Sequence, residues 1–234
     1  MIQEYDERDI PLDLSSGLFI VLYPESGYQY AVADPIKVEY DDQIYIACPR
    51  CGRRVSGSYW KKPREVVLTS RRLPDFLYNY CDNVQFLLSQ NAVDKIISSE
   101  LKGIVSFDKI ETVRFKRTSS KEDSIPAYYR IELARSCITI NHRKSKIKYG
   151  TMYDSEYCTL CNNVPATRNF IHYLSLNMEK FEGYDIFQVY EMGERVFISK
   201  RFLDFCQKNK LTNLYCRPAE IYCKKEVEYF LGRE

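Results

Sequence analysis

Two CxxC pairs constrain the fold of this chain more than any other feature. Cys48 and Cys51 form the first pair within the run CPRCG, and Cys158 and Cys161 form the second pair. Tetrahedral zinc takes four ligands, so the two pairs complete one closed site. We therefore expect a structural zinc ion bound by these four thiolates, with no coordination position left for water or substrate. Because the pairs lie far apart in the sequence, the site requires two parts of the chain to fold toward each other, and zinc binding would contribute about 10 kcal/mol to folding.

A redox function is the alternative reading of a CxxC pair. A thioredoxin-like motif uses one pair between a strand and a helix, so two matched pairs favour a shared metal. The remaining cysteines lack paired spacing, and we expect them to be ordinary buried thiols. They are Cys81, Cys137, Cys206, Cys216 and Cys223.

An internal repeat follows from the same spacing. Cys158 lies 110 residues after Cys48, and the same offset places Ser199 on Ser89. Both regions contain the same features in the same order: the turn with the CxxC pair (the knuckle), a turn with an aspartate, an apolar strand, a serine cap, a helix and a strand. This order indicates a duplication. Further equivalent pairs are Asp75 and Asp185, Tyr80 and Tyr190, Asp94 and Asp204, and Leu101 and Leu211.

Hydrophobic periodicity predicts an α+β fold with antiparallel sheets. Aromatic and β-branched runs at 17–23, 28–33, 43–47, 128–133 and 137–140 predict strands. Apolar residues at helical spacing predict helices that begin after Ser89 and Ser199 and extend to Leu101 and Leu211. The two related strand–helix–strand halves should then be joined at the four-cysteine zinc knuckle.

The predicted organisation has five segments. They are a β-rich N-terminal segment at 1–47, a first repeat half with its knuckle at 48–111, a β-hairpin insertion at 112–157, a second repeat half with its knuckle at 158–223, and a charged tail at 224–234.

Charge and hydropathy argue against several classes of protein. The chain has 34 basic and 32 acidic residues, which gives no general electrostatic reason for binding nucleic acid or membranes. It has no apolar run of the length of a membrane span, and the polar, acidic start at 1–9 lacks the features of a secretory signal. We expect a cytoplasmic protein, where CxxC pairs bind metal more often than they form disulfides. The 20 tyrosines suit either half-buried strands or an interface.

The sequence gives little support to an enzyme. His142 and His172 are the only histidines, neither lies in a catalytic motif, and no phosphate loop, GxSxG or HExxH run occurs. The repeated aspartates suit structural positions better than catalytic ones. Asp94 and Asp204 fall near predicted helix starts, and Asp75 and Asp185 fit turns.

These motifs resemble the double-CxxCG family of bacterial immunity proteins. The resemblance rests on CPRCG at 48–52, the pair at 158–161, the turn at 184–187 and the run VFISKRF at 196–202. It extends from about residue 17 to residue 220. The strand, serine, helix and strand unit is also similar to a broader group of immunity proteins without these cysteines. The second knuckle departs from the pattern, because Asn162 replaces glycine, although asparagine also tolerates a left-handed turn.

The resemblance implies a protein that binds and neutralises a cognate toxin and turns over no substrate. A zinc-ribbon protein that binds nucleic acid or regulates transcription is the alternative, although its basic face is missing. An enzyme with an unrecognised site is a third possibility. Neither the oligomeric state nor the surface that binds the toxin follows from the sequence.

Overall fold

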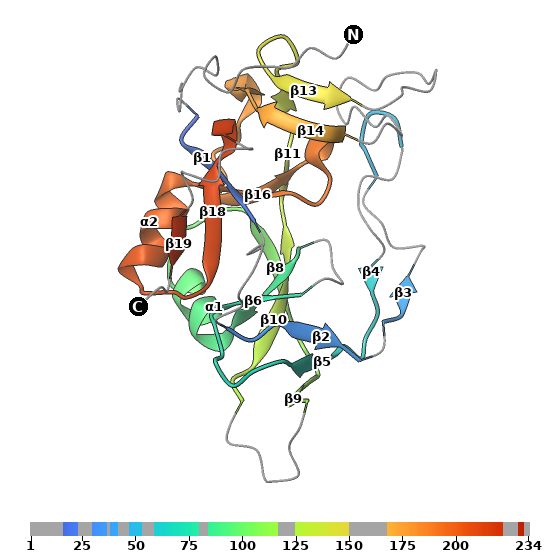
Figure 1. The fold of residues 1–234 in the computed structure, drawn as a ribbon, viewed down its shortest axis with the longest axis vertical. Coiled ribbons are helices and arrows are strands. Elements are labelled where there is room, and N and C mark those ends of the chain that lie inside the picture. Colours follow the sequence, from blue (N-terminus) through green and yellow to red (C-terminus); the bar gives the residue numbers. More distant parts are fainter. Residues whose placement is uncertain are drawn as a thin grey trace.

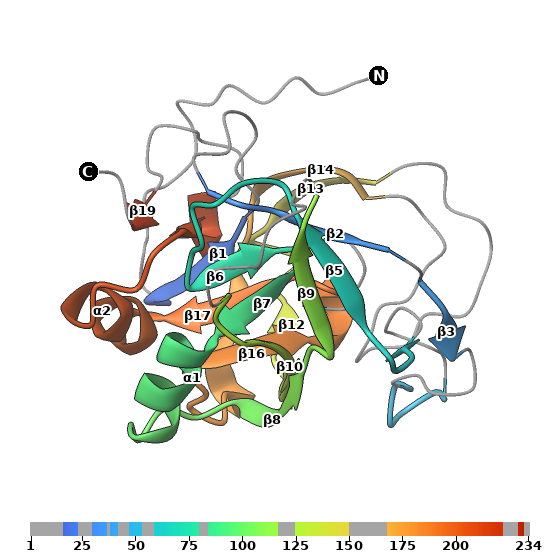
Figure 2. The same ribbon diagram turned by 90° about the horizontal axis from the view of Figure 1, so that it is seen from below.

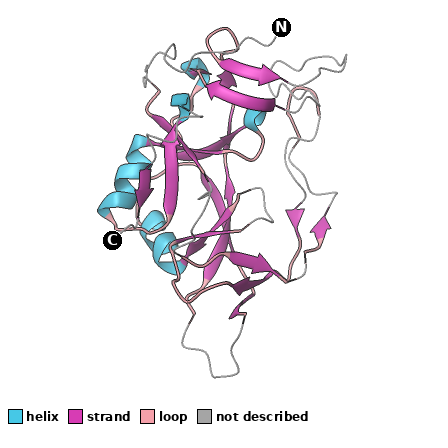
Figure 3. Ribbon diagram, in the orientation of Figure 1, coloured by secondary structure: helices cyan, strands magenta, loops and turns pink. Residues whose placement is uncertain are grey.

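A computed structural model describes residues 16–22, 30–36, 38–41, 47–52, 59–79, 84–116, 125–149, 168–221 and 229–231. Two strand–helix–strand units form the centre of this part of the chain (Figures 1 and 3). The first unit is antiparallel, with the strand order β6-β7-β10-β8. Its elements are β6 (Phe76–Tyr78), β7 (Phe86–Ser89), α1 (Gln90–Ile97), β8 (Ile104–Lys109) and β10 (Tyr128–Leu133).

The second unit contains the other α-helix and a larger sheet. The strand order of this sheet is β11-β16-β17-β1-β18-β19, and only the β11–β16 pair is parallel. Its elements are β1 (Leu18–Val21), β11 (Arg135–Ser136), β16 (Ile186–Val189), β17 (Val196–Ser199), α2 (Lys200–Lys208), β18 (Leu214–Pro218) and β19 (Tyr229–Leu231).

Equivalent strands pair in the same register in both units, and equivalent residues differ by the 110 positions found in the sequence repeat. Phe76 of β6 pairs with Leu88 of β7, and Ile186 of β16 pairs with Ile198 of β17. Each residue of the second pair follows its equivalent by 110 positions. The two units therefore have the same local construction as well as the same order of elements.

The first strand of each repeat lies in the sheet of the other unit. Tyr128 of β10 pairs with Ser89, and Leu18 of β1 pairs with Ser199, so β1 and β10 are equivalent strands. However, β1 precedes the first unit in the chain and lies between β17 and β18 of the second unit. Likewise, β10 follows the first unit in sequence and lies between its β7 and β8. This exchange joins the units by backbone hydrogen bonds, and it crosses the segment boundaries predicted after residues 47 and 111.

Serine caps define where both helices begin, as the sequence predicts. The Ser89 hydroxyl accepts a hydrogen bond from the Ala92 N–H at 3.2 Å, and the Ser199 hydroxyl accepts one from the Phe202 N–H at 3.1 Å. Such a bond satisfies one of the free N–H groups in the first turn. The helices end at Ile97 and Lys208, so the prediction that they continue to residues 101 and 211 is wrong. The leucines at those two positions lie in the connections and still pack on the core, which explains the misleading helical spacing.

The largest core cluster is shared by the two units. Phe76 of the first unit makes edge contacts with Phe86 of the same unit and with Phe202 of α2, at ring-centroid distances of 5.4 and 6.5 Å. Buried residues of both helices line this cluster, so neither helix packs on its own sheet alone. They are Ala92, Val93 and Ile96 of α1, and Phe202, Leu203 and Cys206 of α2.

Smaller sheets surround the two units (Figure 2). A three-stranded sheet covers a separate core cluster, in which Trp60 is fully buried. It consists of β2 (Ala33–Pro35), β5 (Glu65–Leu68) and β9 (Thr112–Phe115). The two-stranded pairs are β3 (Tyr40–Asp41) with β4 (Tyr59–Trp60), β12 (Thr139–Ile140) with β15 (Leu176–Asn177), and β13 (Lys146–Tyr149) with β14 (Arg168–Tyr173). Short 3-10 helices are η2 (Met178–Lys180), η3 (Tyr190–Met192) and η4 (Ala219–Ile221).

The described residues confirm the predicted fold class: α+β with mostly antiparallel sheets. The predicted strands at 17–23 and 128–133 contain β1 and β10. Of the predicted strand at 28–33, residues 30–33 are described and only Ala33 lies in a strand, β2, so this prediction is wrong for residues 30–32. Of the predicted strand at 43–47, only Ala47 is described. Neither described α-helix has the length and apolar character needed to cross a membrane.

Candidate metal-binding and partner-binding sites

The first CxxC pair lies on a tight turn. The Gly52 N–H donates a hydrogen bond to the Cys48 carbonyl at 2.9 Å, and Gly52 has a φ of 72°, in the left-handed region that glycine adopts readily. Cys48 is buried and Cys51 is exposed. This turn holds two thiol-bearing residues within one short loop, as a zinc knuckle requires.

The second pair, Cys158 and Cys161, lies outside the described residues. Its position in the chain is equivalent all the same, because each pair falls between two strands that pair with each other. The antiparallel strands β3 and β4 flank Cys48 and Cys51, and β13 and β14 flank the second pair in the same way. Within the described residues no group of three or more potential ligands has metal-binding geometry, but this part of the chain contains only two of the four predicted cysteines.

The Cys48 thiol of the first knuckle lies within electrostatic range of residues in the second half of the chain. Partial burial raises the pKa of Cys137, and the nearby Glu182 carboxylate and the Cys48 thiol add to this effect. Burial also raises the pKa of the η3 residue Tyr190, which is influenced by the same two thiols. Cys48 therefore lies close to residues more than eighty positions away, which brings one predicted metal ligand to the second half.

The other cysteines divide into two groups. Cys206 and Cys216 are fully buried, and burial raises the pKa of Cys216 to about 12, so the prediction of buried structural thiols is confirmed for both. Cys137 is only partly buried, so that prediction is wrong for it. Cys81 and Cys223 lie outside the described residues.

The repeated aspartates have structural contacts. Asp75 and Asp185 are buried and accept hydrogen bonds from the two N-cap serines, at 2.6 and 2.8 Å. Asp94 and Asp204 are the fifth residues of their helices and not part of the first turn, so an interaction with the helix dipole is a minor effect. Their contacts are with the side chain four positions earlier in the same helix.

His142 pairs with a buried carboxylate. Its Nε2 lies 2.5 Å from Oε1 of Glu191, and the other oxygen of Glu191 accepts a hydrogen bond from the Ile140 N–H at 2.6 Å. The pair joins the turn after β12 to η3. The side chain of His172, the other histidine, is outside the described part of the structure.

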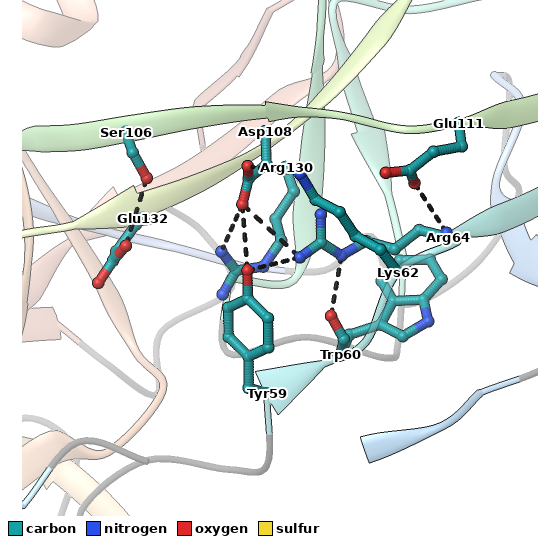
Figure 4. Close-up of polar contacts among 9 residues, drawn as sticks. All are labelled: Tyr59, Trp60, Lys62, Arg64, Ser106, Asp108, Glu111, Arg130 and Glu132. Atoms are coloured by element: carbon teal, nitrogen blue, oxygen red, sulfur yellow. Dashed lines mark hydrogen bonds and ion pairs between the residues drawn. The ribbon is translucent and has the colours of Figure 1, made fainter. Parts of the chain in front are cut away.

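A charged cluster at the end of β8 was not predicted from the sequence (Figure 4). Asp108 of β8 lies at its centre, 3.3 Å from Lys62 Nζ, 3.6 Å from Arg64 Nη2 and 3.7 Å from Arg130 Nη1. Tyr59 lies between the two arginines, whose guanidinium carbons are 5.2 and 4.7 Å from the centre of its ring. Its hydroxyl donates to Asp108 at 3.3 Å and accepts from Arg64 Nη2 at 2.7 Å.

The two arginine side chains of this cluster are buried, so each charge needs a group of opposite charge in contact with it. The Arg64 side chain is fully buried, the Arg130 side chain is 5% exposed, and the carboxylate between them is 27% exposed. Partial desolvation raises the pKa of Asp108, but the hydrogen bond from Lys62 and the charge of Arg64 outweigh it, so the net shift is downward. Arg64 Nη1 has no hydrogen-bond partner among the described residues. Asp108 therefore contacts two buried cations, and its removal would take a carboxylate away from both of them.

No sequence signal could have revealed this cluster. Its members come from β4, the β4–β5 connection, β8 and β10, and each one alone reads as an ordinary polar residue of a strand or turn. The pairing of Arg130 with Asp108 across β10 and β8 depends on the exchanged position of β10, which only the structure reveals.

The described residues thus form a duplicated α+β protein whose polar clusters hold its elements together. A model of the Imm11 immunity protein family matches residues 56–220. The chain belongs to this family of immunity proteins, and the expectation of an immunity protein is confirmed. The match includes both helices and the second CxxC pair but neither β1 nor the first pair. No curated protein matches the chain. The resemblance to the double-CxxCG family stays a prediction.

Proposed function

We propose that this protein acts in the cytoplasm by binding a cognate bacterial toxin and blocking it, and that it turns over no substrate. Membership of the immunity protein family is the observation that carries the proposal. The described polar clusters support it, because Asp75, Asp185 and Glu191 are buried and engaged in holding backbone and side chains in place. A general base needs access to a substrate proton, which such positions do not offer.

We further propose that Cys48, Cys51, Cys158 and Cys161 bind one structural zinc ion. The donor set consists of thiols, which suit zinc, and the turn at 48–52 has the compact form of a knuckle. Cys48 also lies near Cys137 and Tyr190, so a zinc ion there would strengthen the contact between the two halves. The metal would stabilise the fold and take no part in chemistry.

Co-expression with the toxin encoded beside its gene tests the function. Bacteria that produce the toxin should die without this protein and grow with it, and the two chains should elute together after mild lysis. Growth rescue by a protein that never forms a complex would instead indicate an enzyme that reverses the damage. Failure to rescue growth would contradict the proposal as a whole.

A further inference from the structure

We propose that the outer edge of β8 is the place where the toxin binds, by adding an extended segment to the sheet of the first unit. The proposal rests on the proposed function, since it takes the toxin to be the partner. In Figure 2, β8 lies at the margin of the molecule. The recognition is by backbone hydrogen bonds, with side chains selecting the segment.

Among the described residues, no strand covers the outer edge of β8. This strand is last in the order β6-β7-β10-β8. The Ile110 N–H donates to the Tyr128 carbonyl at 2.8 Å, and antiparallel strands alternate between hydrogen-bonded and non-hydrogen-bonded pairs. Asp108 therefore directs its backbone groups toward β10, whereas Phe107 and Lys109 direct theirs outward. Neither of these two residues makes a backbone hydrogen bond on that side to the described part of the chain.

The equivalent edge in the second unit is covered. There the last strand of the repeat is β18, and β19 pairs with it antiparallel, with Tyr215 opposite Phe230. The same kind of unit thus accepts an additional strand at this edge when one is present. β8 differs from β18 because no described strand takes the place of β19, so the first unit offers a vacant position of known geometry.

The charged cluster fixes the open strand in place. Asp108 connects β8 to Arg130 of β10 and to Lys62 and Arg64 of the β4–β5 connection. At the end of the open stretch the Glu111 N–H donates to the Arg64 carbonyl at 3.2 Å, so β5 covers the chain from that point on. A strand held on both sides of its free segment loses little conformational freedom when a partner binds.

The exposed side chains along this edge define the partner's chemistry. Val105 is unpaired at a bulge, because Glu132 lies opposite Ser106 while the next residue lies opposite Ile104, and it is 65% exposed. Lys102 and Lys109 are exposed on either side of it. We expect the toxin segment to place an apolar side chain beside Val105 and carboxylates near the two lysines. Asp108 does not oppose this pattern, since its charge is already engaged by three cations.

Hydrogen exchange on the intact protein, free and bound to a catalytically inactive toxin, tests the edge directly. The amides of Phe107 and Lys109 should exchange rapidly in the free protein and become protected in the complex. The amides of Asp108 and Ile110 should be protected in both states, because they face β10. Unchanged exchange at Phe107 and Lys109 in a complex that does form would overturn the proposal.

Substitutions give an independent readout. Lys109→Pro removes an outward N–H and should weaken toxin binding about 100-fold, while Lys109→Ala, which keeps the N–H, should weaken it less than about 10-fold. Val105→Asp should also weaken binding, by repelling the acidic segment. Equal affinities of a folded Lys109→Pro variant and Lys109→Ala would refute strand addition. If the unaltered protein fails to bind the toxin, the proposed function fails instead, so the two failures are distinguishable.

Discussion

Asp75 and Asp185 each accept a hydrogen bond from the connection between the helix and the last repeat strand of the other unit. The two connections are equivalent in the repeat. Oδ1 of Asp75 accepts a hydrogen bond from the N-cap hydroxyl of Ser89 at 2.6 Å. Oδ2 accepts one from the Thr212 N–H at 3.0 Å, and Thr212 lies in the connection between α2 and β18. A single buried carboxylate thus orients its own helix and fixes the chain that enters the last repeat strand of the other unit.

The second carboxylate repeats this arrangement. Oδ1 of Asp185 accepts from the Ser199 hydroxyl at 2.8 Å, and Oδ2 accepts from the Lys102 N–H at 3.0 Å. Lys102 precedes Thr212 by 110 residues, so the serine hydroxyl and backbone N–H donors are equivalent between the two sites. The reciprocal contacts, together with the exchange of β1 and β10, make the two units one cooperative structure.

Asp75→Ala should therefore lower the free energy of unfolding by about 3–5 kcal/mol, because it leaves several buried donors without an acceptor. Asp185→Ala should have a similar effect. Asp94→Ala is the control, since the exposed Asp94 side chain contacts only Gln90 of its own helix, and its effect should stay within about 0.5 kcal/mol. Urea unfolding measures all three. Equal stabilities of Asp75→Ala and Asp94→Ala would contradict the role of the carboxylate.

The helix caps show what could be read from the sequence. Ser89 and Ser199 follow apolar runs and precede helical spacing, so local pattern alone located both helix starts. The exchange of β1 and β10 could not be predicted, because either strand could satisfy its hydrophobic pattern in either sheet. The contact of Asp108 with Arg130 depends on that exchange, so the complete charged cluster cannot be predicted from the sequence either.

The two units approach each other closely at Gly103. Its φ is 115°, and a Cβ atom there would lie 1.8 Å from the carbonyl oxygen of Ile186. Gly103→Ala should therefore destabilise the protein by more than about 3 kcal/mol, or prevent folding. Gly193→Ala is the matched control, since Gly193 also has a positive φ but no atom within 4 Å of the added Cβ, and only the backbone strain of about 1–3 kcal/mol is expected. Thermal unfolding of both variants checks the difference, and equal melting temperatures would argue against a close contact.

Asp108 should make stability depend on pH. Its pKa is lowered in the folded state, so its contribution is complete above the unfolded pKa of about 3.9 and is lost as the pH falls through the folded value. Asp108→Asn should destabilise the protein by about 2–4 kcal/mol at pH 7, because two buried guanidinium groups lose the charge of the Asp108 carboxylate. The difference from the unaltered protein should shrink below about pH 4.

Glu132→Gln serves as the control for this cluster. Glu132 is exposed and accepts only a 3.3 Å hydrogen bond from Ser106, so its loss should change stability by less than about 0.5 kcal/mol. Chemical unfolding at several pH values compares the two variants. A stability difference for Asp108→Asn that stays constant down to pH 2 would contradict the assignment.

Metal analysis should find about one zinc ion per chain, as four thiolates per tetrahedral site imply. Cys48→Ser and Cys158→Ser should each abolish zinc binding and destabilise the protein to a similar degree, since both break one shell. Cys137→Ser, at a cysteine outside the four, should retain the metal. Loss of zinc in only one of the first two variants would exclude a shared site.

The central claim is that this immunity protein works by binding. Isothermal titration of the purified protein with a catalytically inactive form of the toxin encoded beside its gene measures that claim most directly. The account predicts a saturable one-to-one complex with a Kd in the nanomolar range or below, at the tight end typical of inhibitory complexes. Protection of cells from the active toxin, combined with no measurable heat or co-elution at micromolar concentrations, would contradict it.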